Sequence, residues 1–174
     1  MTTDQQIINR VTKSTLTTLD LEQYHISGER VLIDMRDMLY QGLLLREKDF
    51  RQYIITHNWN QYQEKFIAIT CSTNAIIPTW AYMLITTAVS PFAKKVIFGT
   101  LQQLEERLLL DELSKIDWTV YLNAKVVIKG CNKKHIPESA YVEVVNKLLP
   151  IASSIMFGEP CSTVPLFKRP KAGS

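Results

Sequence analysis

Apolar and polar residues alternate along this chain in blocks that predict strands and helices in turn. The continuous apolar run KFIAITC at residues 65–71 is typical of a strand that is buried on both faces. The predicted strands are 65–71, 94–100, 124–131 and 153–158, and the predicted helices are 78–87, 101–116 and 137–149. This alternation predicts parallel strands joined by right-handed helical crossovers, which is the α/β fold class.

The first third of the chain is less regular. A short helix is predicted at residues 4–14, and strands are predicted at 15–22 and 30–35. In EKDFRQYIITH, the apolar face Phe50, Tyr53, Ile54 and His57 has the i, i+3, i+4, i+7 spacing of a helix. We therefore expect an irregular, strand-rich N-terminal third.

Length and composition favour one globular domain. The chain has 174 residues, of which 46% are hydrophobic and 21% charged, close to the average for soluble domains. We predict a single three-layer α/β domain over residues 1–167, with helices on both sides of a mostly parallel sheet. A basic, disordered tail is expected at residues 168–174.

Charge and hydropathy limit the binding partners and the cellular location that we expect for this protein. The net charge is +3, and the tail KRPKAGS supplies three of the basic residues, so the rest of the chain is close to neutral. Nucleic-acid binding is not expected, because it would need a clustered basic face. No stretch is long and apolar enough to span a membrane, and the polar N-terminus lacks the apolar core of a signal peptide. We expect a cytoplasmic protein that does not bind membranes.

A sequence echo links two predicted strand-to-helix turns. ITCSTNAIIPTWAY at residues 69–82 and KGCNKKHIPESAY at residues 129–141 both carry a Cys and then Pro-x-x-Ala-Tyr. Each Pro is expected at the first helical position, where its missing N–H has no cost. The echo has a purely structural explanation, two similar turns, but packing does not require a Cys in either turn.

The third cysteine suggests a shared site. Cys161 also follows a predicted strand, so Cys71, Cys131 and Cys161 all fall where open α/β sheets bind ligands. Three thiolates would suit zinc or an iron–sulfur cluster, and His135 and Glu159 are candidates for a further ligand. Sulfur atoms around one metal lie close together, so this hypothesis predicts that strands 65–71 and 125–131 are neighbours.

Two alternatives remain open. In the first, the protein is a thiol-dependent enzyme with Cys71 or Cys131 as nucleophile, activated near a helix N-terminus, with His135 as a candidate base. In the second, it is a non-catalytic interaction or scaffold protein whose cysteines are buried and inert. Asp34, at the end of VLIDM, is more readily explained as a helix cap than as a site residue. Nucleotide-binding glycine motifs are absent from the sequence.

Longer motifs carry a family resemblance. TCSTNAIIPTWAYML, VIKGCNKKHIPESAY and SIMFGEPCSTVP, with LREKDFR upstream, resemble an uncharacterised bacterial family classified as a domain of unknown function. The resemblance runs from about Ile8 to Phe167. It implies a role in iron–sulfur cluster assembly, with the proteins of that pathway as partners. In that setting Cys71, Cys131 and Cys161 would handle iron, a cluster or persulfide sulfur.

Overall fold

The α/β prediction is confirmed by the structure, a computed structural model that describes residues 16–130 and 133–170. Most predicted elements form within a few residues of their expected bounds, and the predicted helix at 4–14 lies outside the described residues. The strands are β1 (Leu16–Asp20), β2 (Arg30–Asp34), β3 (Phe66–Thr70), β4 (Lys95–Phe98), β5 (Lys125–Lys129), β6 (Ser154–Glu159) and β7 (Ser162–Lys168). The helices are α1 (Glu47–Thr56), α2 (Thr79–Val89), α3 (Leu101–Leu113) and α4 (Glu138–Leu148).

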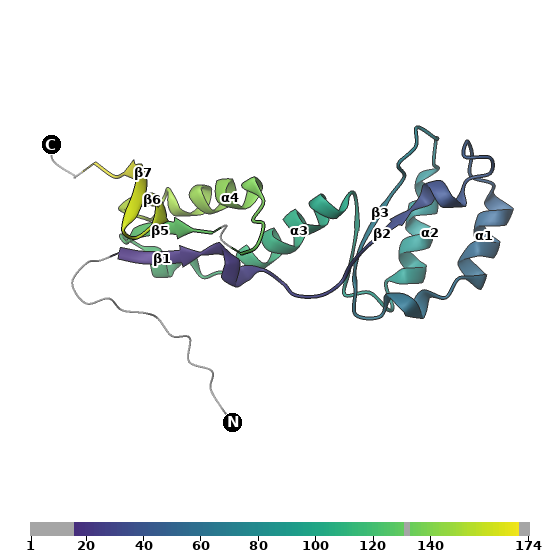
Figure 1. Cartoon of the computed structure of the whole chain (residues 1–174), viewed down its shortest axis with the longest axis horizontal. Helices are drawn as coiled ribbons and strands as arrows, with labels where there is room; N and C mark the ends of the chain where they lie inside the picture. The colour runs from purple at the N-terminus through teal and green to yellow at the C-terminus, as the bar shows by residue number, and fades with distance from the viewer. Residues whose placement is uncertain (1–15, 131–132, 171–174) are drawn as a thin grey trace, which may run out of the picture. The chain divides into compact units, whose positions relative to one another are not determined.

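The strands form two sheets, where the sequence pattern predicts one. One sheet has the order β1-β5-β6-β7, whose strands are labelled in Figure 1. The other sheet has the order β2-β3-β4. The chain divides accordingly into two compact units: unit 1 comprises residues 1–25 and 110–174, and unit 2 comprises Ile26–Leu109. That both units act as a single domain stays a prediction.

Unit 2 has the predicted three layers. Its strands are all parallel, and β3 lies between β2 and β4. On one face of the sheet, buried side chains of α1 and α2 pack against buried side chains of β2 and β3. The helices contribute Phe50, Ala81, Ile85 and Val89, and the strands contribute Ile33, Ile67 and Ile69. On the other face, Leu104 and Leu108 of α3 pack against Phe66 and Ala68. Both faces of β3 are therefore buried, which explains its unbroken apolar sequence.

An ion pair fastens the start of α3 to the edge of unit 2. The Arg30 guanidinium donates from Nε to Glu105 Oε1 at 2.6 Å and from Nη2 to Oε2 at 3.1 Å. The same side chain donates to the backbone carbonyls of Ile26 and Gly28 and lies over the Phe66 ring. One side chain thus connects strand, loop and helix.

Unit 1 contains the same parallel core with one added strand. β5 lies between β1 and β6, and β7 pairs with β6 in antiparallel fashion. Strand β7 was not predicted, and it extends the ordered chain into the expected tail. Arg169, the residue after β7, is also held against unit 1. Its guanidinium donates hydrogen bonds to the carbonyl oxygens of Leu149 and Ala152 near the end of α4.

From Trp59 in unit 2 and Trp118 in unit 1 onward, the two units repeat one architecture with a constant shift of 59 residues. Matched positions include Trp59 and Trp118, Pro78 and Pro137, Ala81 and Ala140, Tyr82 and Tyr141, and Gly99 and Gly158. The correspondence extends to backbone geometry: Glu64 N–H donates to Phe92 O, and Asn123 N–H donates to Ile151 O. Glu64 and Asn123 both have positive φ, 61° and 57°. The sequence echo is thus part of a repeat that spans each unit.

The first strands of the two units follow the same plan with a shift of 14 residues. β1 ends at Asp20 and β2 ends at Asp34, and each aspartate accepts a hydrogen bond from the backbone N–H two residues later. Each therefore caps a short 3-10 helix, Leu21–Tyr24 or Met35–Met38. No helix among the described residues is long and apolar enough to cross a membrane.

Candidate functional sites

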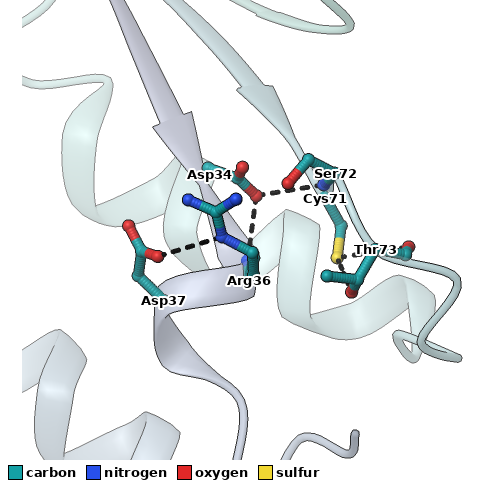
Figure 2. Close-up of polar contacts among 6 residues, drawn as sticks. All are labelled: Asp34, Arg36, Asp37, Cys71, Ser72 and Thr73. Atoms are coloured by element: carbon teal, nitrogen blue, oxygen red, sulfur yellow. Dashed lines mark hydrogen bonds and ion pairs between the residues drawn. The ribbon is translucent and has the colours of Figure 1, made fainter. Parts of the chain in front are cut away.

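Polar groups converge where the strands of unit 2 end. Asp34 Oδ1, at the end of β2, accepts the backbone N–H of Arg36 at 3.0 Å and that of Ser72 at 3.1 Å (Figure 2). Because Ser72 follows β3, this carboxylate ties together the ends of two neighbouring parallel strands. Asp34 therefore serves as the cap that its position suggested, and it also holds the loop that carries Cys71.

Cys71 directly follows β3, as predicted, and its side chain is half-buried. Its Sγ lies 3.3 Å from Thr73 Oγ1 and 3.8 Å from the carbonyl oxygen of Thr73 (Figure 2). The loop then runs to Pro78, which is the N-cap of α2 rather than its first helical residue. Pro137 occupies the same N-cap position at α4, so the expected position of both prolines was wrong by one residue.

The unit 2 site is electrostatically asymmetric. Burial raises the pKa of Asp34, but hydrogen bonds from the Ser72 hydroxyl and from the backbone N–H groups of Arg36 and Ser72 outweigh burial and hold the pKa below its ordinary value. Burial raises the pKa of Tyr82, and negative charge on Cys71 and Asp34 adds to this effect. Asp34 is therefore ionised at neutral pH, beside a neutral phenol.

Tyr82, one turn into α2, lies near enough to Cys71 and Asp34 for their negative charge to affect its pKa. Its ring packs edge-on against Phe98, at the end of β4, with the centroids 5.1 Å apart. Tyr141 and Phe157 form the matching pair in unit 1, at 5.7 Å. The signal that could have located this residue is the repeated Pro-x-x-Ala-Tyr, which places a Tyr one turn into each helix.

The corresponding edge of unit 1 carries several of the predicted ligands. Lys129 ends β5 and Glu159 ends β6, and their side chains form an ion pair with Nζ and Oε2 3.2 Å apart. This pair raises the pKa of Lys129. Cys161 is exposed in the turn between β6 and β7. His135 is exposed in the loop before α4.

Gly130, next after β5, lies where the backbone closely approaches another side chain. A Cβ at this position would come within 2.7 Å of the Tyr141 hydroxyl oxygen. The matched position in unit 2 is Cys71. The unit 2 sheet therefore accommodates a side chain at this position, whereas the unit 1 sheet excludes one.

The predicted ligands fall into different units. Cys71 lies in unit 2, whereas Cys161, Glu159 and His135 lie in unit 1. The expectation that strands 65–71 and 125–131 are neighbours was wrong, because β3 and β5 belong to different sheets. Within residues 16–130 and 133–170, no three His, Cys, Asp or Glu side chains are grouped to hold a metal ion. Cys131 lies outside the described residues, so a site that includes it stays a prediction.

The comparisons with known proteins give a family and no activity. The family model described as "Protein of unknown function (DUF2480)" matches residues 5–169. The chain belongs to this family. The resemblance found from the sequence motifs is thereby confirmed, and the family carries no described function. No curated protein and no solved structure matches the chain.

Proposed function

We propose that this protein binds a thiolate-ligated metal centre, zinc or an iron–sulfur cluster, at the carboxyl edge of the unit 1 sheet. The ligands proposed are Cys131 and Cys161, with Glu159 and His135 as the candidates for the two remaining positions. Cys71 is not included, which revises the three-cysteine site that the sequence suggested.

The observation that carries this proposal is the pairing of β5 with β6. These strands are hydrogen-bonded neighbours, with Ile128 opposite Phe157. Cys131 comes two residues after the end of β5 in the sequence, and Cys161 comes two residues after the end of β6. The ends of adjacent strands are about 4.8 Å apart, so we expect thiols that follow them in the sequence to come within reach of one tetrahedral ion.

The local charge is compatible with this role. The Glu159 carboxylate is held at the strand end by the Lys129 ammonium, and both side chains are partly exposed. Metal binding would exchange this surface ion pair, which is screened by solvent, for a coordinate bond. Thiolate ligands select zinc or iron over harder ions such as magnesium. The family resemblance adds iron–sulfur cluster assembly as the proposed pathway, with its proteins as the proposed partners.

The test is to purify the native chain anaerobically, without chelators or an affinity metal column. Elemental analysis and an absorption spectrum should find zinc in near-stoichiometric amount, or iron with sulfide and a broad visible absorption. Reconstitution with zinc, and separately with iron and sulfide, covers loss during purification. A protein that takes up neither metal would contradict the proposal.

A second candidate function is thiol chemistry at Cys71 in unit 2. It is favoured by the position of Cys71, Asp34 and Thr73 at the carboxyl ends of β2 and β3, with Tyr82 nearby, which gives the thiol polar neighbours and partial access to solvent. In this role Cys71 should react with iodoacetamide much faster than Cys161 at neutral pH. Replacing Thr73 by Val removes the nearest hydroxyl and should change the rate at Cys71 alone. Peptide mapping after a timed reaction measures both rates, and equal rates would exclude a specialised Cys71.

A further inference from the structure

The repeat shows a difference at the outer edge of each sheet. In unit 1, β7 pairs along the outer edge of β6. In unit 2, the matched strand β4 pairs with β3, and no other strand in the described part of the chain covers its outer edge. Matched aromatic residues of these strands reflect the difference: Phe98 of β4 is 70% exposed, whereas Phe157 of β6 is half-buried.

The β6–β7 ladder shows which side chains such an edge accepts. Phe157 is opposite Val164, and Ile155 is opposite Phe167. Both are pairs of an aromatic and a β-branched residue, a favourable combination across antiparallel strands. The positions of β4 that match Phe157 and Ile155 are Phe98 and Val96. An antiparallel strand on β4 should therefore place a β-branched residue opposite Phe98 and an aromatic residue opposite Val96.

We propose that two copies of this protein associate by antiparallel pairing of β4 with β4 of the second copy. A two-fold axis perpendicular to the sheet keeps each face continuous, so residues directly opposite each other must come from the same face. The register centred on Ile97 satisfies this requirement. It places Val96 of each copy opposite Phe98 of the other, which reproduces both aromatic and β-branched pairs of the β6–β7 ladder.

The charges at this edge also fit a second copy. In the register centred on Ile97, Lys95 of each copy is opposite Gly99 of the other, which has no side chain. The two Lys95 ammonium groups lie at opposite ends of the ladder, so like charges are not brought together. Two three-stranded sheets would become one six-stranded sheet in which the β4 edge and both Phe98 rings are covered.

The association is tested by sedimentation of the native chain over a range of concentrations up to its solubility limit. Phe98→Lys should give a monomer without loss of fold, because this side chain is largely exposed. The matched control is Ile55→Lys, at a position on α1 that is 77% exposed; this variant should associate like the native chain. A monomeric native chain, or a Phe98→Lys variant that associates normally, would overturn the proposal.

A cross-link tests the register independently. Directly opposite residues in an antiparallel pair have Cα atoms about 4.5–5.5 Å apart, within the range of about 4.4–6.8 Å that a disulfide spans. Ile97→Cys, in a chain whose native cysteines are serine, should therefore oxidise to a disulfide-linked dimer. Leu122→Cys, at an exposed position of unit 1, should remain monomeric under the same conditions. Equal cross-linking of both variants would refute the register.

Discussion

Replacing Arg30 by Met should destabilise unit 2 by about 2–3 kcal/mol. An exposed ion pair contributes about 0–1 kcal/mol, and breaking a fully buried pair costs about 3–5 kcal/mol. The side chains of Arg30 and Glu105 are 13% and 34% exposed, so their ion pair falls between these limits. The carbonyl oxygens of Ile26 and Gly28 lose donors as well. Met keeps the aliphatic contact with Phe66, so the change isolates the polar interactions.

Urea unfolding, followed by tryptophan fluorescence, measures this free energy. Trp59 and Trp80 lie in unit 2 and only Trp118 in unit 1, so the signal reports mainly on unit 2. The matched control is Arg51→Met, because Arg51 forms an exposed i,i+4 pair with Glu47 and should cost less than about 1 kcal/mol. Glu105→Gln, which retains an acceptor for Arg30, should have an intermediate effect. If Arg30→Met and Arg51→Met have equal free energies of unfolding, the reasoning about this anchor is wrong.

Three further predictions follow from side chains and backbone in single units. His57 Nε2 lies 2.9 Å from the Gln61 amide nitrogen, and burial lowers the pKa of His57. The native state should therefore lose stability as pH falls below about 6.5, where the unfolded histidine gains a proton. His57→Gln should reduce the pH dependence of the free energy of unfolding, measured between pH 8 and 5. Gly158 has a φ of 119°, and a Cβ there would lie 2.7 Å from Ser162 O. Gly158→Ala should therefore lower the free energy of unfolding, measured by heat or urea, by about 1–3 kcal/mol. The control Gly42→Ala, in a turn with open space around the Cβ, should cost less. Ile85 and Val144 are fully buried at matched positions, so alanine at either should lower the free energy of unfolding by about 2–4 kcal/mol. Amide hydrogen exchange should increase first in α2 for Ile85→Ala and in α4 for Val144→Ala. The same exchange pattern in both variants would contradict separate cores.

Local patterns predicted the elements well because they depend on near neighbours. The apolar run before Cys71 and the turn at Pro78 identify β3 and α2 without knowledge of the rest of the fold. Pairing depends on distant segments, and here local pattern failed. β5 pairs with β1, more than a hundred residues earlier, while β2, β3 and β4 form a sheet of their own within the intervening segment. Periodicity carries no information on such a nested arrangement.

The repeat was visible in the sequence only where identical residues recur. Pro-x-x-Ala-Tyr indicated two similar turns, but matched core positions such as Ile85 and Val144 share only apolar character. The same limit affected the site. Cys71 and Cys161 were correctly placed after strands, yet nothing in their spacing assigns them to different units. Strand β7 was missed because Pro165 interrupts its pattern, and Pro is tolerated there because β7 is an edge strand.

The proposed metal centre is tested most directly by comparing the metal content of three single variants, Cys71→Ser, Cys131→Ser and Cys161→Ser. All three should be purified and reconstituted identically, and circular dichroism should confirm that each is folded. We predict that Cys131→Ser and Cys161→Ser lose the metal, whereas Cys71→Ser retains it, because Cys71 lies in unit 2. Retention of metal by Cys161→Ser, or its loss from Cys71→Ser, would contradict a centre at the edge of the unit 1 sheet.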